Sequence, residues 1–172
     1  MAELTQQERL QPCLLDRLTD DEPDKKQEAR DQRVVSLRRL REGVLRDLGW
    51  LLNATNLAAL EDLDDYPAVA QSVVNFGMPA LAGTLASSVD VNDFERQIYQ
   101  AIVDFEPRIL RDTLKVRMVM TADEMSHNAM TFEIEGQLWA QPVPQRLYLK
   151  TEIDLELGEV KLSDYSGSTS VG

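Results

Sequence analysis

The fold of this chain is decided by residues 130–138, which read MTFEIEGQL. Met130, Phe132, Ile134 and Leu138 alternate there with polar side chains. Successive side chains of a β-strand point to opposite faces of the sheet, so this period of two predicts a strand with one apolar and one polar face.

Two neighbouring segments show the same alternation. In residues 114–121, Leu114, Val116, Met118 and Met120 alternate with Lys115, Arg117 and Thr121, and residues 147–157 alternate leucine and isoleucine with mostly charged side chains. Three such strands predict an antiparallel sheet that is apolar on one face. The Ser- and Gly-containing residues 163–172 are predicted to form a disordered tail.

Two helices are predicted before the sheet. Residues 37–51 carry apolar side chains at steps of three and four, with Ser36 as N-cap and a stop at Asn53. A second helix is predicted from Asn92, which would cap it together with Glu95, to a stop at Pro107.

The segment between these helices is predicted to hold a brief buried strand at residues 72–76 and a short helix at residues 80–86. Helices first and strands last indicate an α+β fold, a single domain whose N-terminal helices pack on a C-terminal, mainly antiparallel sheet. We expect a flexible N-terminal arm at residues 1–33, the domain at residues 34–162 and the tail after it. The arm carries an apolar patch around Leu14 and Leu18, which could instead pack onto the domain.

Composition excludes several classes of function. The formal net charge of −12 repels phosphate backbones and anionic membrane surfaces, so we expect no nucleic-acid partner. Basic residues gather between Lys25 and Arg46, which could guide docking to a protein partner, although such a run more often forms a solvated face. No apolar run reaches the length of a membrane span and residues 1–10 lack a signal-peptide core, which predicts a cytoplasmic protein without direct membrane insertion.

The residues that commonly carry chemistry are sparse. One cysteine (Cys13) and one histidine (His127) form neither a disulfide nor a zinc cluster, so no metal or cofactor is expected. His127 lies near Ser126 and Asp123 without the glycines of a nucleophile elbow, which indicates a polar loop. Trp50 and Trp139 are interpreted as core side chains.

Four segments together resemble a known family. They are LLDRL (residues 14–18), LRDLGWLLN (45–53), VVNFGMP (73–79) and IVDFEPR (102–108). In this order and spacing they are similar to the TssE proteins of type VI secretion systems and to their relatives, the baseplate wedge proteins of contractile-tailed phages.

The resemblance implies a non-catalytic, structural baseplate component that binds the other wedge subunits and seeds polymerisation of the contractile sheath. It also implies that Glu106, Pro107 and Arg108 form the family's Glu-Pro-Arg motif and engage neighbouring wedge subunits. Sheath subunits would dock by strand addition, for which residues 147–157 offer a candidate edge.

Pro107 makes a rigid corner, from which Glu106 and Arg108 could reach a partner; a local salt bridge between the two remains the alternative. An exposed pair contributes less than about 1 kcal/mol, so replacing both with Ala is expected to leave unfolding little changed. Two other functions stay open: a lysozyme-like peptidoglycan hydrolase, which needs two carboxylates across a sugar cleft, and a small regulatory adaptor.

Overall fold

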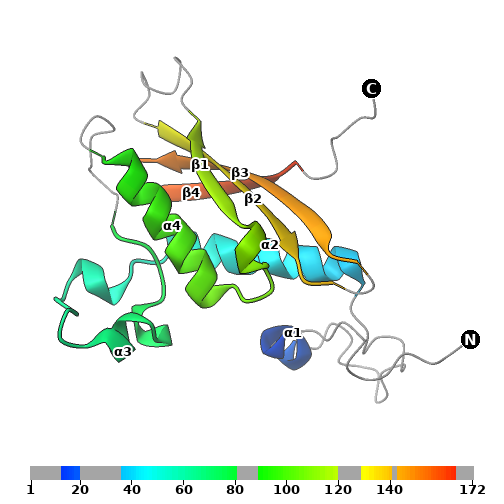
Figure 1. Ribbon diagram of the computed structural model, residues 1–172, viewed down its shortest axis with the longest axis horizontal. Coiled ribbons are helices and arrows are strands. Elements are labelled where there is room, and N and C mark those ends of the chain that lie inside the picture. The colour runs from blue at the N-terminus through cyan, green and yellow to red at the C-terminus, as the bar shows by residue number, and fades with distance from the viewer. Residues whose placement is uncertain (1–12, 20–35, 81–88, 120–128, 141–142, 166–172) are drawn as a thin grey trace, which may run out of the picture.

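The computed structural model describes residues 13–19, 36–80, 89–119, 129–140 and 143–165. Its helices precede a four-stranded antiparallel sheet, which confirms the α+β prediction (Figure 1). Residues 120–128, with His127, and the helix predicted at residues 80–86 lie outside the described residues, except that Ala80 is not helical.

The sheet has the strand order β1-β2-β3-β4. Its strands are β1 (Lys115–Val119), β2 (Ala129–Leu138), β3 (Gln145–Asp154) and β4 (Glu159–Asp164). The longest pairing joins β2 to β3, with Phe132 opposite Thr151. Phe132, Ile134 and Leu149 are completely buried on the apolar face, as the alternation predicted.

The third strand predicted at residues 147–157 is present as β3, but its predicted end at Leu157 was wrong. β3 ends at Asp154, whose Oδ1 accepts hydrogen bonds from the backbone N–H groups of Glu156 and Leu157. Gly158, with φ of +71°, completes the turn into β4. The chain therefore folds back on β3, so β3 is an internal strand, and β4 extends two residues into the segment assigned to the tail.

Two long helices cover the apolar face of the sheet (Figure 1). α2 (Leu37–Asn53) packs against β4 and begins as predicted, with the Ser36 hydroxyl accepting from the Arg39 N–H at 3.2 Å. α4 (Val91–Phe105) packs against β1. Its N-cap is Asp90 rather than Asn92, because the Asp90 carboxylate accepts from the Asp93 N–H, and Glu95 bonds to β1 instead.

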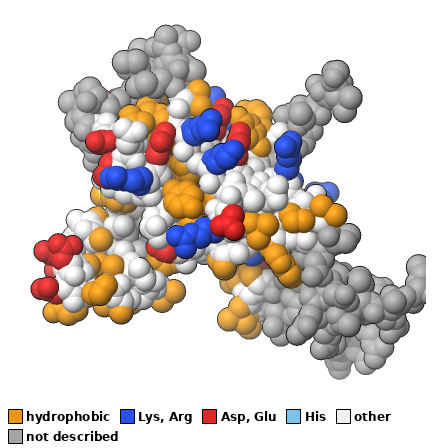
Figure 2. Space-filling model, viewed as in Figure 1, with side chains coloured by type: hydrophobic (Ala, Val, Ile, Leu, Met, Phe, Trp, Pro, Cys, Tyr) orange, Lys and Arg blue, Asp and Glu red, His pale blue; other side chains and the backbone are white. Residues whose placement is uncertain are grey.

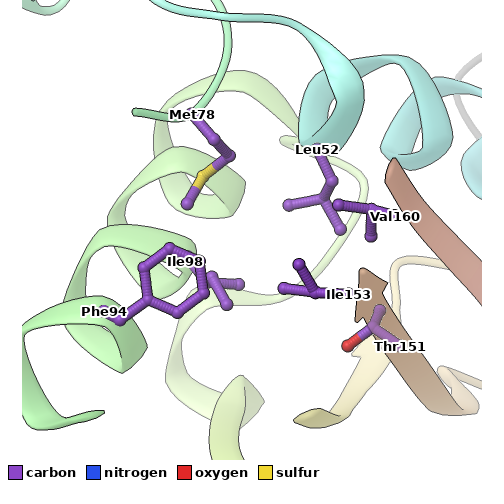
Figure 3. A pocket seen from close by; sticks show the side chains of 7 residues that line it. All are labelled: Leu52, Met78, Phe94, Ile98, Thr151, Ile153 and Val160. Atoms are coloured by element: carbon purple, nitrogen blue, oxygen red, sulfur yellow. The ribbon is translucent and has the colours of Figure 1, made fainter. Parts of the chain in front are cut away.

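The core lies between these helices and the sheet. Phe94 of α4 meets Phe132 edge-on, with ring centroids 5.1 Å apart. A small apolar pocket remains in this layer (Figure 3). The side chains that line it come from both long helices, two strands and the connecting segment: Leu52, Met78, Phe94, Ile98, Thr151, Ile153 and Val160.

The connection between α2 and α4 is a lobe of short helices: η3 (Leu57–Ala59), α3 (Pro67–Ala70) and η4 (Val73–Asn75). The buried strand predicted at residues 72–76 is wrong, because η4 is a 3-10 turn and Val73 is 81% exposed. Figure 2 shows acidic and hydrophobic side chains side by side on this lobe. The exposed acidic residues there are Glu61, Asp62, Asp64 and Asp65.

The core assignment of the two tryptophans is also wrong. Trp50 is 53% exposed and Trp139 is 45% exposed. Trp50 lies one helical turn after Arg46, whose guanidinium carbon is 5.1 Å from the indole centroid. A cation stacked on a surface indole explains how α2 carries a tryptophan outside the core.

Candidate wedge-binding site

The Glu106-Pro107-Arg108 corner is built where α4 ends. Glu106 is the C-cap of α4, and its backbone N–H still donates to the Ile102 carbonyl at 2.8 Å. Pro107 then stops the helix and is exposed. The chain beyond it runs beside the end of β2, where the Trp139 N–H donates to the Arg108 carbonyl at 2.7 Å. The corner is therefore held by both a helix and a strand.

The two charged side chains of the corner point into the protein. Glu106 is only 3% exposed. Arg108 donates from Nε to Glu106 Oε1 at 2.7 Å and from Nη2 to Glu106 Oε2 at 2.5 Å. The local salt bridge that the sequence left as an alternative is present. The expectation that this pair is exposed was wrong, and so was the basis for expecting little effect on unfolding.

Arg108 also reaches α2. Its Nη2 donates to Asp47 Oδ2 at 2.6 Å, which joins two residues 61 positions apart. Burial opposes the charge on Arg108, but the hydrogen bonds and charges of Glu106 and Asp47 outweigh burial and raise its pKa above the ordinary value. One guanidinium thus ties the end of α4 to the middle of α2.

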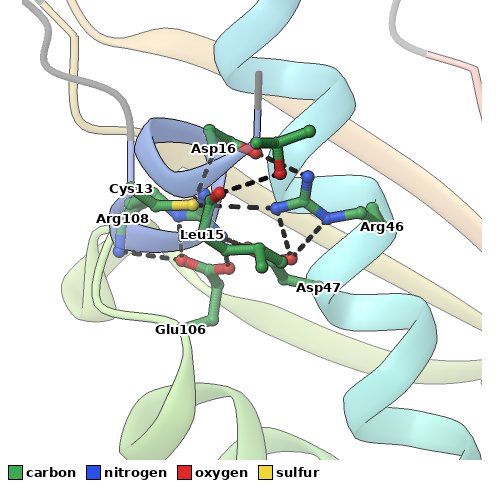
Figure 4. Close-up of polar contacts among 8 residues, drawn as sticks. Cys13, Leu15, Asp16, Arg46, Asp47, Glu106 and Arg108 are labelled. Carbon is green, nitrogen blue, oxygen red and sulfur yellow. Dashed lines mark hydrogen bonds and ion pairs between the residues drawn. The ribbon is translucent and has the colours of Figure 1, made fainter. Parts of the chain in front are cut away.

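The cluster continues from Asp47 to the N-terminal helix α1 (Leu14–Leu18) (Figure 4). Arg46 donates from Nε to Asp47 Oδ1 at 2.9 Å and from Nη1 to Asp16 Oδ1 at 2.5 Å. The thiol of Cys13 donates to Asp16 Oδ2 at 3.0 Å. The result is a row of alternating charges, Asp16, Arg46, Asp47, Arg108 and Glu106, which links α1 and α2 to the corner after α4.

The pKa shifts of Arg46 and Asp16 in this row have identifiable causes. The hydrogen bond to Asp16 is the largest influence on Arg46 and raises its pKa, with Asp47 adding to it against the effect of burial. Burial would raise the pKa of Asp16, but bonds from Cys13 and Arg46 and the nearby charge of Arg108 lower it below the ordinary value. Both charged forms are therefore stabilised where α1 meets α2.

α1 docks through its polar side chains. Its leucines remain outside: Leu14 is 69% exposed and Leu18 is 74% exposed. Gly43 of α2 lies at this contact, and a Cβ there would be at ordinary contact distance, 3.4 Å from Asp16 Oδ2 and 3.5 Å from an Arg108 nitrogen. The helix of the N-terminal arm thus packs onto the domain while presenting an apolar surface.

The sequence placed Glu106, Pro107 and Arg108 at the site but missed Asp16, Arg46 and Asp47. Arg46 belonged to the basic run interpreted as a solvated face, yet its side chain is only 34% exposed. The sequence did contain a signal for these three residues, because Asp16 and the Arg46-Asp47 pair lie in two of the segments that resemble the family. The structure brings those segments together with the corner.

The fourth segment packs beside them. Met78 and Thr55 form a parallel bridge just after α2, and Phe76 meets Phe105 at the end of α4 with ring centroids 5.3 Å apart. Gly77, with φ of +126°, permits this contact because a Cβ there would lie 2.4 Å from the Ala54 carbonyl oxygen. The described residues form no group of three or more side chains suited to a metal ion, and none of their helices is long and apolar enough to cross a membrane.

Comparison with known proteins agrees with this arrangement. The family model for baseplate wedge protein gp25 matches residues 38–143, which include α2, the lobe, α4, the corner and β2. Searches of curated proteins and of solved structures returned no significant match. Because the family model covers more than half of the chain, this protein belongs to the gp25 family of baseplate wedge proteins, the family that includes TssE.

Proposed function

We propose that the chain is the TssE-type wedge component of a type VI secretion system, a cytoplasmic structural protein that binds the other wedge subunits and seeds polymerisation of the contractile sheath. Membership of the family supports a structural baseplate role and partners among the other baseplate proteins. The observation that carries the finer proposal is the meeting of three family-like segments at one partly buried row of charges.

The row of charges suggests how the Glu-Pro-Arg motif serves binding. Glu106 is too deeply buried to contact a partner without rearrangement. Its partner Arg108 instead fixes Asp47, which orients Arg46, and Arg46 holds Asp16 of α1. On this proposal Pro107 and the leucines of α1 contact the wedge subunits, and Glu106 and Arg108 position that surface. Holding a short helix in place beforehand reduces the entropy lost on docking.

The test is co-purification with the wedge subunits from cells that express them together. Exchanging Leu14 and Leu18 for Ser should abolish co-purification, because on this proposal they form the contact surface, and the fold leaves both exposed. Leu60→Ser is the matched control, since Leu60 is 79% exposed on the lobe and should be neutral. Retention of the wedge subunits by the double variant would show that α1 is not the contact surface.

The chemistry of the cluster favours a structural role over a glycoside hydrolase. A glycosidase needs one carboxyl group that keeps a proton and gives it to the leaving oxygen. Asp16, Asp47 and Glu106 each accept hydrogen bonds from a guanidinium instead. We expect purified protein to leave a cell-wall suspension turbid, and clearing that the Glu106→Gln exchange abolishes would establish the enzyme.

A further inference from the structure

The lobe between α2 and α4 exposes a group of large apolar side chains. Leu60 is 79% exposed, Tyr66 is 61% exposed, and Val73 and Val74 are 81% and 63% exposed. All four lie within residues 60–74, where the short helices η3, α3 and η4 pack against one another. Apolar side chains that gather on a surface mark a contact site, whereas single ones need no explanation.

The lobe has a defined shape, because polar side chains join its short helices. Asn75 accepts from the Ala58 N–H through Oδ1 at 2.8 Å, and its Nδ2 donates to the Ala70 carbonyl at 2.8 Å. The ring contact between Phe76 and Phe105 then attaches the lobe to α4. The exposed side chains are therefore presented in a fixed arrangement, which reduces the entropy lost when a partner binds.

The fold uses the residues that follow the two valines but not the valines themselves. Phe76 packs on α4, Gly77 permits the close approach to α2, and Met78 is buried in the core. Val73 and Val74 belong neither to the core nor to the half-buried side chains packed against it. Two adjacent aliphatic side chains left in solvent are a surface that a partner would gain free energy by burying.

The charge beside this apolar surface is negative throughout. The sequence contains no lysine or arginine between Arg46 and Arg96. Among the described residues, no basic side chain forms an ion pair with the exposed acidic residues of the lobe, Glu61, Asp62, Asp64 and Asp65. Figure 2 shows these acidic side chains next to the apolar ones. A complementary partner therefore brings positive charge together with apolar side chains.

The geometry of the lobe favours a helix as that partner. In the part of the chain that the structure describes, no three side chains converge as the ligands of a metal ion would. Residues 57–76, all of them described, contain no strand, so an incoming strand would find no edge to pair with. A helix satisfies its own backbone hydrogen bonds and can lay an apolar stripe on a surface made of side chains.

We propose that the lobe is a second docking surface, which binds a helix of another protein that carries an apolar stripe flanked by lysine or arginine. The stripe covers Leu60, Tyr66, Val73 and Val74, and the cations lie beside the acidic residues of the lobe. Figure 1 shows the lobe and α1 as separate projections from the body. One chain can therefore hold this helix and the wedge subunits at the same time.

The experiment measures the binding of synthetic peptides to the full chain by fluorescence anisotropy at physiological ionic strength. The probe has about 18 residues, with leucine at helical spacing and lysine at the other positions. One control peptide holds the same residues in an order that gives no apolar stripe, and another has glutamate in place of lysine. The chain should bind the probe about tenfold more tightly than either control peptide.

Variants of the lobe identify the side chains that bind. Exchanging Val73 and Val74 for Ser should weaken probe binding about tenfold, and Leu60→Ser should weaken it several-fold. The matched control combines Glu156→Gln with Leu157→Ser, because Leu157 is 72% exposed in the turn between β3 and β4. This control should leave binding unchanged. All of these side chains are exposed, so urea titrations should give the unfolding midpoint of the unmodified chain.

A charge exchange separates recognition by the lobe from attraction by the net charge of the whole chain. Exchanging Glu61, Asp64 and Asp65 for Lys reverses the sign of the charge on the lobe and should make the glutamate peptide the tighter ligand. Asp62 is kept, because its Oδ1 accepts from the Asp64 N–H at 3.0 Å and holds the turn.

Four results would overturn the inference. Equal binding of the probe and the peptide without a stripe would show that net charge alone attracts it. Unchanged binding after the Val73 and Val74 exchange would place the contact off the lobe, and an unchanged preference after the charge exchange would remove the role of the acidic residues. A dimer in sedimentation that the Val73 and Val74 exchange dissolves would show that a second copy of the chain covers the surface.

The same variants separate this inference from the proposed function. Leu60→Ser should weaken probe binding while retaining the wedge subunits in co-purification. Exchanging Leu14 and Leu18 for Ser should lose the wedge subunits while retaining the probe. Each surface can therefore fail its own test without affecting the other.

Discussion

At the scale of single residues, the choice of arginine at position 108 follows from geometry. Its planar guanidinium donates to both oxygens of Glu106 and also to Asp47. A lysine ammonium is a point charge that cannot match two carboxylates in this forked arrangement. Glu106 is almost completely buried, and Arg108 bonds both of its carboxylate oxygens.

Removal of the guanidinium should therefore cost stability. We expect Arg108→Ala to lower the free energy of unfolding by about 3 kcal/mol, because it leaves a buried carboxylate without its partner. Arg108→Lys should fall between this variant and the unmodified protein. Adding Glu106→Gln to Arg108→Ala should recover part of the loss, since the orphaned charge is gone. Urea titrations measure all four, and an unchanged midpoint for Arg108→Ala would contradict the buried-pair argument.

The sequence predicted the corner of this site but not the acidic residues that the corner and Arg46 bind. Proline at position 107 indicated the corner, because proline ends a helix whatever surrounds it. Asp16 and Asp47 gave no such local signal, since their partners lie 30 and 61 residues away along the chain. Periodicity shows which face of a helix is apolar, but not which charged side chain at the border of that face turns inward to meet another charge.

At the scale of elements, prediction succeeded where local patterns were strong. α2 has Ser36 as its N-cap and ends at Asn53, as predicted, because a hydroxyl cap and a long apolar stripe act locally. β4 was missed because Glu159-Val160-Lys161-Leu162 offers only two apolar side chains, and its strand state depends on pairing with β3. The exposed η4 was misread for the related reason that β-branched residues do not by themselves specify a strand.

Asn53, the last residue of α2, stabilises β4, a strand whose sequence gives only a weak strand signal. Its amide bonds both backbone groups of Val160, so Asn53→Ala should leave two edge groups without a protein partner. We expect a loss of about 1–2 kcal/mol and faster hydrogen exchange at the Val160 amide. Asn53→Asp keeps the acceptor but not the donor and should protect Val160 partly. Equal protection of Val160 in Asn53→Ala would show that α2 does not secure this edge.

At the scale of the whole molecule, two kinds of interaction hold the elements together. An apolar layer between the helices and the sheet holds α2, α4 and the strands together. A row of charges attaches α1 to the outside of this body without contributing its leucines to the core. The leucines of α1 can therefore be exchanged without opening the core, whereas Arg108 and Glu106 serve both the fold and the placement of α1.

The last prediction compares two aromatic residues that the sequence could not rank by burial. Phe132 has no exposed surface and meets Phe94 edge-on, so Phe132→Ala should lower the free energy of unfolding by about 3–5 kcal/mol through lost burial and the cavity left behind. Trp50 is the larger side chain, yet it is half exposed and stacks only on Arg46 among the described ring contacts. Trp50→Ala should therefore cost about 1 kcal/mol, the typical value of a surface cation–π contact. Urea unfolding followed by circular dichroism measures both variants, and a Trp50→Ala loss equal to that of Phe132→Ala would place Trp50 in the core after all.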